Sequence, residues 1–272
     1  MVIILNLKIK EVEKEIDEKN FEKALGILDE IKAKDDGYEL SLLFKVTCLF
    51  NLKRYGECLE IIGALLKNNP NEELLLADKV MCHYFLDDEK QALKSLRKLE
   101  SVVNKNDAHS LCVVSQLCNL VNDPKKAINY ADLSLEIDEN FESALIEKAQ
   151  AASQLKDHGM MIDCANKLIS LKGDDESPLS LTLPFVLKLF AGDYRGCLDV
   201  VNSFDELDGE IEEMMKVAIY KEMYENLNIE IYISAKVESG IDDALRMLFD
   251  YLYEGIEGGP IGDAYYVIIK KS

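Results

Sequence analysis

A recurring small or slim side chain is the feature that most constrains how this chain can fold. Successive members of the series are separated by 34, 34, 35, 34 and 36 residues. The members are Ala24, Cys58, Ala92, Ala127, Met161 and Cys197. A nearly fixed step of this size is typical of a solenoid, in which each unit buries its apolar face only against its neighbours. The chain is therefore expected to offer a long surface rather than a catalytic pocket.

Each unit has the pattern of two helices joined by a short turn. In the second unit, apolar residues recur at spacings of three and four over residues 40–50, which indicates one helical face. A polar turn and a second apolar face over residues 58–66 follow, and Pro70 ends that helix because proline cannot continue the hydrogen-bond ladder. The pattern predicts further helix pairs at 107–121 with 124–137, 141–155 with 158–171, and 177–191 with 194–206. Pro184 lies inside one of them and predicts a kink or a shorter helix there.

These features resemble the tetratricopeptide repeat (TPR) family, in about six repeats over residues 5–206. The resemblance rests on the period, on the small residue of each second helix and on aromatic residues such as Tyr55 and Tyr194 beside some turns. It implies an all-α fold, a right-handed superhelical α-solenoid of helix-turn-helix repeats. The chain departs from the family pattern because it has no tryptophan, and because Val46 and Val80 replace the small residue usual in the first helix.

The repeat pattern ends near residue 206. Residues 208–226 are expected to form a helix, and the alternating, β-branched residues 227–233 favour a strand. A helix at 240–254 and a strand at 264–269 follow, so residues 207–272 are predicted to form a strand–helix–strand appendage or, in the alternative interpretation, a further helical repeat. Either would cap the repeat domain at 5–206.

Charge and composition exclude several classes of partner. A formal net charge of −20 and a pI near 4.6 argue against nucleic acid and against anionic membranes, which would both repel the chain. No apolar stretch approaches the roughly 18 residues of a membrane span, and the apolar N-terminus is too short for a signal peptide. The seven cysteines form no Cys-x-x-Cys pair and fall mostly on apolar helical faces. They predict reduced core thiols in a cytoplasmic protein.

Two short motifs resemble the nucleotide-base segments of small GTPases. They are Ser234-Ala235-Lys236 and the run Asn104-Lys105-Asn106-Asp107. No Gly-x-x-x-x-Gly-Lys-Ser/Thr is present to hold phosphates, and the two motifs lie too far apart in sequence for one nucleotide pocket. The sequence therefore predicts no catalytic residues, no cofactor and no metal site, and the chain is expected not to be an enzyme. A regulatory or nucleotide-binding role of the Ser-Ala-Lys segment remains the alternative.

The resemblance implies that the first helix of each repeat lines an inner groove. The inner positions are apolar or carry amides and hold no Lys or Arg, which favours a protein or peptide partner with apolar anchors. The predicted groove consists of Leu43, Thr47, Asn51, Ala77, Met81, Phe85, Cys112, Gln116, Leu120, Ile146, Gln150 and Gln154. The expected function is a non-enzymatic protein–protein interaction scaffold. In the alternative interpretation, the chain's own terminus covers part of this groove.

Overall fold

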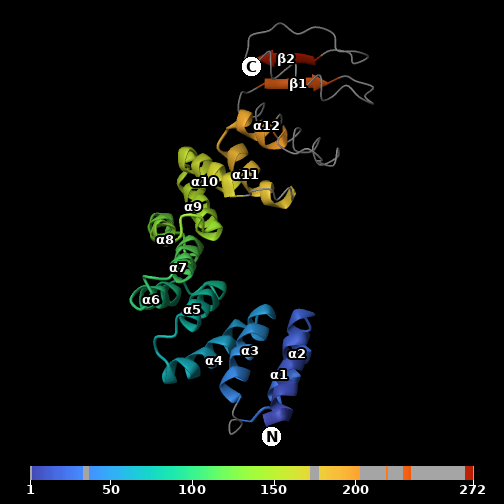
Figure 1. Ribbon diagram of the computed structural model, residues 1–272, viewed down its shortest axis with the longest axis vertical. Coiled ribbons are helices and arrows are strands. Elements are labelled where there is room, and N and C mark those ends of the chain that lie inside the picture. The colour runs from blue at the N-terminus through green and yellow to red at the C-terminus, as the bar shows by residue number, and fades with distance from the viewer. Residues whose placement is uncertain are drawn as a thin grey trace. The chain divides into compact units, whose positions relative to one another are not determined.

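The computed structural model describes residues 2–32, 37–171, 178–202, 219, 229–233 and 267–271. The chain divides into two compact units, Met1–Ala151 and Ala152–Ser272. Figure 1 shows its labelled helices and strands, coloured along the chain. The described part is dominated by helices, as the sequence predicts.

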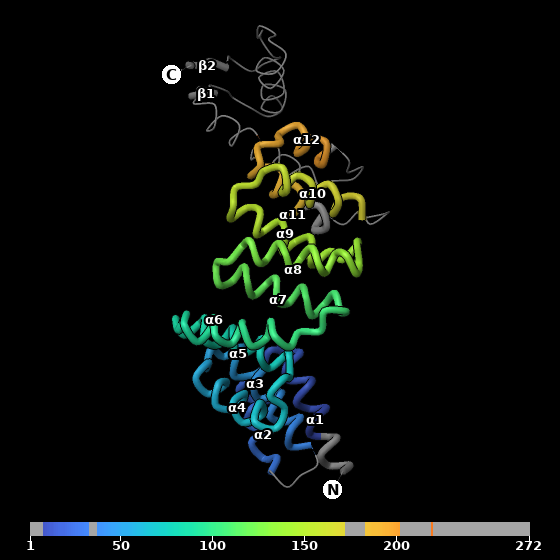
Figure 2. The backbone as a smooth tube through the Cα atoms, turned by 90° about the vertical axis from the view of Figure 1, so that its left-hand side faces the viewer, coloured from blue at the N-terminus to red at the C-terminus, as the bar shows by residue number. Residues whose placement is uncertain are grey.

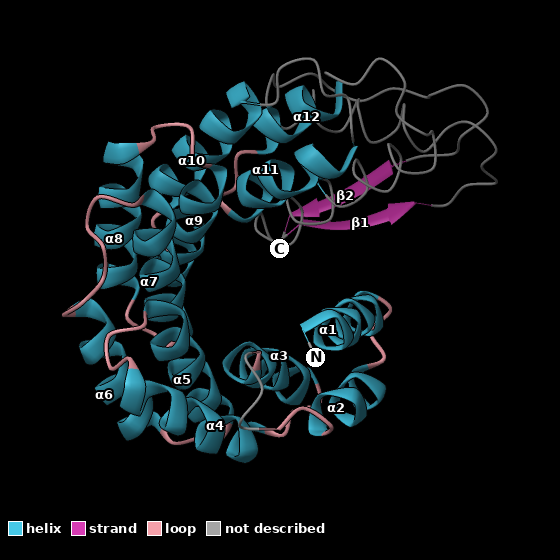
Figure 3. Ribbon diagram, turned by 60° about the horizontal axis from the view of Figure 1, so that its bottom comes forward, coloured by secondary structure: helices cyan, strands magenta, loops and turns pink. Residues whose placement is uncertain are grey.

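The first unit is a stack of helical hairpins. Its helices are α1 (Val2–Asp17), α2 (Phe21–Asp29), α3 (Tyr38–Asn51), α4 (Tyr55–Asn68), α5 (Glu73–Phe85), α6 (Glu89–Glu100), α7 (Ala108–Leu120), α8 (Pro124–Ile137) and most of α9 (Glu142–Leu155). Consecutive helices pack as pairs, and Figure 2 shows α5 to α8 following one another along the stack. In Figure 3, α3, α5 and α7 lie on the inner side of this unit, and α4, α6 and α8 lie on its outer side. The predicted helix-turn-helix pattern is confirmed.

The turns inside the hairpins repeat one backbone conformation. In the described part of the chain, a residue with φ between +56° and +75° ends the first helix of each pair: Lys19, Lys53, Asp87, Asn122, Lys156 and Gly192. Each lies five residues before the recurring small residue of its unit. At the second turn, Lys53 N donates to Phe50 O at 2.9 Å and Arg54 N donates to Leu49 O at 2.8 Å, which is the Schellman motif. The period seen in side chains is therefore also a period of the backbone.

The recurring small residues lie where the two helices of a hairpin cross. Five of the six are fully buried, and Met161 is 2% exposed. Cys58 Sγ donates to Val46 O at 3.6 Å, and Ser115 Oγ donates to Ala127 O at 2.7 Å, so each contact joins the second helix to the first. A small side chain permits this close approach of two backbones. All seven cysteine side chains are buried, as predicted.

The second unit continues with α10 (His158–Leu171), α11 (Pro178–Phe190) and α12 (Tyr194–Asn202). Because α11 continues past Pro184 to Phe190, the proline does not end the helix. Asp193 joins α11 to α12: its Oδ1 accepts from Gly196 N at 3.0 Å, and its Oδ2 accepts from the buried Lys188 Nζ at 3.0 Å. The ion pair compensates for burying the ammonium group.

Two strands follow in the second unit. β1 (Ile229–Ile233) pairs antiparallel with β2 (Val267–Lys271), and Ile231 lies opposite Ile269. Both strands were predicted close to these positions and are confirmed. The helix expected at 240–254 lies outside the described residues. Among the described residues, no helix is long and apolar enough to cross a membrane.

Candidate protein-interaction surface

One face of α5 leaves apolar side chains uncovered. Leu74, Asp78, Met81 and Phe85 are separated by four, three and four residues and therefore share a helical face, called here the α5 stripe. Leu74 is 65% exposed and Phe85 is 46% exposed, while Met81 is half-buried. Val80, which points away from this face, is fully buried in the core of the unit. The α5 stripe is thus an apolar surface interrupted by one carboxylate.

α7 presents a matching face beside it. His109, Val113, Gln116 and Leu120 follow the same four, three, four spacing and are called here the α7 stripe. His109 and Gln116 are exposed, and Val113 and Leu120 are half-buried. α5 packs directly against α7, and both helices lie on the inner side of the first unit (Figure 3).

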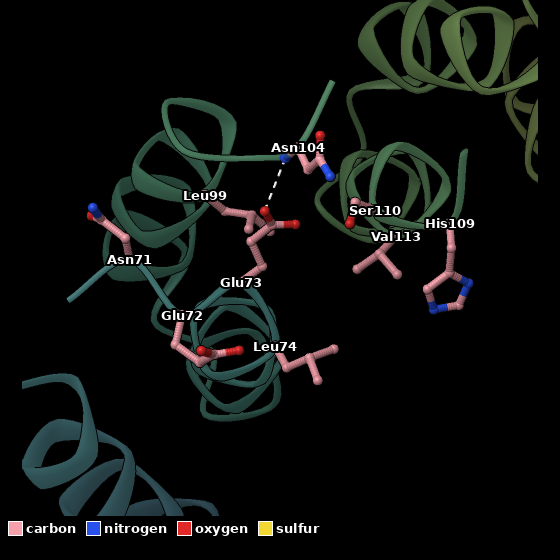
Figure 4. Close-up of a pocket in the computed structure, with 9 residues that line it drawn as sticks. All are labelled: Asn71, Glu72, Glu73, Leu74, Leu99, Asn104, His109, Ser110 and Val113. Carbon is pink, nitrogen blue, oxygen red and sulfur yellow. Dashed lines mark hydrogen bonds between the residues drawn. The ribbon is translucent and has the colours of Figure 1, made fainter. Parts of the chain in front are cut away.

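A pocket of about 370 Å³ opens where the two stripes begin. Leu74 from α5 and Val113 from α7 extend toward the same space, and Leu99 contributes further apolar surface (Figure 4). Its polar lining includes Glu73, whose Oε1 accepts from Asn104 N at 2.9 Å. The remaining lining residues are Asn71, Glu72, His109 and Ser110. The pocket combines an apolar wall with an acidic and amide-bearing rim.

An aromatic cluster marks the other end of the α5 stripe. The Phe85 ring stacks on Tyr55 with ring centroids 5.1 Å apart, and it meets Phe50 edge-on at 5.8 Å. Tyr84 also contacts Phe85 edge-on, at 5.5 Å. These contacts join α3, α4 and α5, so Phe85 is held in one orientation while nearly half of it stays open to solvent.

Two carboxylates on the inner helices escaped the sequence analysis. Burial raises the pKa of the half-buried Asp78 to about 6. Burial also raises the pKa of Glu147 in α9, although Asn119 Nδ2 donates to Glu147 Oε2 at 2.8 Å and partly opposes that shift. Each directly follows a predicted groove residue, Ala77 or Ile146. The sequence feature that could have identified them is an acidic residue within the mainly apolar stretch of a first helix.

The fold matches solved repeat structures of low sequence identity. A tetratricopeptide repeat protein from Parabacteroides merdae superposes with a TM-score of 0.55 at 13% identity, covering 90% of this chain and 97% of its own. Yeast Tom70 superposes with a TM-score of 0.55 at 13% identity, covering 84% of this chain and 46% of its own. PilW, a type IV pilus biogenesis factor, superposes with a TM-score of 0.51 at 16% identity, covering 71% and 92%. No curated protein sequence matches the chain.

One stretch of the sequence matches the profile of a known repeat directly. Residues 142–175 match the sequence profile of the tetratricopeptide repeat, and this stretch contains α9 and α10 in full. Residues 142–175 therefore have the sequence of a tetratricopeptide repeat, and the fold of the chain matches that of tetratricopeptide repeat structures. The 34-residue period of its hairpins is the period expected for TPR units.

The structure places the twelve predicted groove residues in different environments. The exposed ones are Leu43, Thr47, Asn51, Phe85, Gln116, Ile146, Gln150 and Gln154. Met81 and Leu120 are half-buried. Ala77 and Cys112 are only 5% and 6% exposed, so these two offer little surface to a partner. Gln154 belongs to the second unit, and the surface of the first unit therefore ends at Gln150.

The structure describes one of the two nucleotide-like motifs. Asn104–Asp107 forms the turn between α6 and α7, where Asp107 Oδ2 accepts from Ser110 N at 2.9 Å and Asn104 Oδ1 accepts from Asn106 N at 3.1 Å. These side chains cap a helix and shape a turn. The Ser234–Lys236 motif lies outside the described residues. Within the described part, no group of three or more His, Cys, Asp or Glu is arranged for a metal ion.

Proposed function

We propose that this TPR chain is a non-enzymatic protein–protein interaction scaffold of the cytoplasm. The inner surface of its first unit binds a segment of a partner protein. The exposed apolar face of α5, with Leu74 at 65% and Phe85 at 46%, carries this proposal. Water-exposed apolar side chains that are grouped on one face and rimmed by polar groups are typical of interaction sites.

The parts of the surface suit different parts of a peptide. The pocket beside Leu74 and Val113 is large enough for an apolar side chain of the partner. The exposed amide of Gln116 can both donate and accept hydrogen bonds, and so can bind the partner's backbone. Phe85 offers a rigid aromatic surface for a second apolar anchor.

Leu74→Glu is the sharpest test of this surface. Short random peptides are selected by display against the immobilised full chain, and the selected peptides are then measured against variants. Leu74 is largely exposed and lies in the first turn of α5, where an acidic residue is compatible with the helix dipole, so the variant should fold normally. Met81 and Phe85 pack against neighbouring side chains and would confound binding with folding.

Leu133→Glu is the matched control. Leu133 is 41% exposed on the outer helix α8, and the substitution adds the same charge to an apolar surface residue. The expected result is that Leu74→Glu weakens the selected peptides at least about tenfold, because a carboxylate must be desolvated against an apolar anchor. Leu133→Glu should leave binding unchanged. Equal affinity for both variants, or no selected peptide, would contradict the proposed function.

A further inference from the structure

Asp78 is a carboxylate on the α5 stripe that pairs with no cation among the described residues. It lies one helical turn along the α5 stripe from Leu74, which lines the pocket. No hydrogen bond or ion pair reaches its carboxylate from the described residues, and burial is the sole cause of its raised pKa. Lys79 is its neighbour in sequence, but successive side chains diverge by about 100° around a helix. The free protein therefore keeps a partly desolvated charge uncompensated on its inner surface.

We propose that the segment bound by the first unit is basic, with a Lys or Arg cation paired to Asp78 and an apolar side chain in the pocket beside Leu74. This inference rests on the proposed function and adds the chemistry of the partner. An ammonium or guanidinium group would form a charge-assisted hydrogen bond with the carboxylate, and its aliphatic stem could lie across Met81.

The geometry of the α5 stripe fits an extended segment. Leu74 and Asp78 are four residues apart, which corresponds to about 6 Å along a helix axis. In an extended peptide, side chains two residues apart lie on the same face and about 6.7 Å from each other. A segment running along α5 can therefore place an apolar residue at the pocket and a cation, two positions away, at Asp78.

The surrounding charges favour the same partner. The α7 sequence contains no Lys or Arg, and His109, at the pocket end of the α7 stripe, is the basic residue of that stripe. On the α4 side of α5, the charge of Asp78 acts on the buried thiols of Cys58 and Cys82 rather than on a cation. Two cations on the inner helices are already engaged, since Lys45 pairs with Asp29 and Lys148 pairs with Asp132. Glu147 on α9 is a buried carboxylate that is bonded to an amide rather than to a cation. An acidic segment would meet like charges here.

A double-mutant cycle tests the inference. Random peptides are selected by display against the full chain, and the expected sequences carry Lys or Arg two positions from Leu, Ile, Met or Phe. One selected peptide and its Lys→Gln version are then titrated against the wild type and Asp78→Asn by fluorescence anisotropy. Either single change should weaken binding about tenfold, and the second should add little once the first is made.

Glu60→Gln is the matched control for bulk charge. Glu60 is exposed on the outer helix α4, and its loss changes the net charge by the same amount as Asp78→Asn. It should leave affinity for the Lys peptide unchanged. Equal weakening by Glu60→Gln and Asp78→Asn would reduce the effect to bulk attraction and overturn the inference.

Other outcomes separate this inference from the proposed function. Peptides that lose binding in Leu74→Glu but show no coupling between their cation and Asp78 would overturn the basic partner while the interaction surface stands. Selected peptides without Lys or Arg would likewise overturn the basic partner and leave the interaction surface in place. Self-association of the chain that Leu74→Glu abolishes would identify a second copy as the occupant and overturn an external basic segment.

Discussion

At the scale of single residues, Asp78 illustrates how the proposed interaction surface can be unfavourable for the free protein. Its carboxylate is half-buried, and its charge acts on the buried thiols of Cys58 in α4 and Cys82 in α5. A charge in this position costs free energy unless a cation compensates for it. Residues that reduce the stability of the free protein are often retained because a ligand needs them.

Asp78→Asn should stabilise the free protein in a pH-dependent way. The folded-state pKa, about 6, lies above the unfolded value of about 3.9, so the native state binds the proton more tightly. The wild-type chain therefore loses stability as the pH rises from about 4 to 6, and the loss is complete above that window. The gain from Asp78→Asn should be near zero at about pH 4 and reach about 1–3 kcal/mol at pH 7.

Urea denaturation of both chains at several pH values measures this difference. Taking the difference between variant and wild type cancels the other carboxylates, which titrate in both proteins. Glu60→Gln, on the exposed face of α4, should show no such trend. A gain for Asp78→Asn that stays constant from pH 4 to 7 would contradict the raised pKa.

At the scale of elements, the left-handed residue at the end of each first helix sets the hairpin geometry. Only the sixth of these positions is a glycine, Gly192, while three are lysines. The left-handed conformation brings the Cβ of a non-glycine residue close to its own backbone and costs about 1 kcal/mol. The hairpins nevertheless close in the same way, because the Schellman hydrogen bonds and the packing of both helices determine the turn.

Lys53→Gly should therefore stabilise the first unit by about 0.5–1 kcal/mol. Lys53 has φ of 60°, and the hydrogen bond from its amide to Phe50 O survives the substitution. Glu60→Gly is the control of opposite sign, because Glu60 is an exposed residue in the middle of α4 and glycine there costs about 1 kcal/mol. Chemical denaturation monitored by circular dichroism gives both values. Destabilisation by Lys53→Gly would show that the lysine side chain itself supports the turn.

At the scale of the whole molecule, the free energy of unfolding of a repeat protein is approximately a sum over its repeats and the contacts between neighbouring repeats. Each hairpin of the first unit contacts the next one, through α2 with α3, α4 with α5, and α6 with α7. In the second unit, α10 packs against α11, and α11 against α12. Stability in such a chain should depend on how many neighbouring hairpins are present.

Shortened chains test this additivity. A chain ending at residue 171 keeps α1 to α10, and one ending at residue 137 keeps α1 to α8. Both should remain helical, and the thermal midpoint should fall from the full chain to the first and again to the second, because each removal uncovers an apolar helix face. Circular dichroism melts report both properties. Complete unfolding of the chain ending at residue 171 would show that the repeats require the C-terminal residues to fold.

The sequence alone determined the period and the helix pairs, because these depend on local patterns of apolar side chains and turn residues. It favoured the two strands but left a further helical repeat open as the alternative, and the structure decided between them. The helix expected at 141–155 is α9 at Glu142–Leu155, and the cysteines are buried as predicted. Pro184 shows the limit of local rules, since α11 continues past it despite the missing amide donor.

Only the tertiary structure decided which inner residues face solvent. Ala77 and Asp78 are consecutive in α5, yet the alanine is buried and the carboxylate lies half-buried on the inner face. The pocket depends on Leu74 and Val113, which come from different repeats and meet only because α5 packs against α7. A sequence pattern specifies the face of one helix, whereas burial and the pKa of a carboxylate depend on every neighbour that excludes water from it.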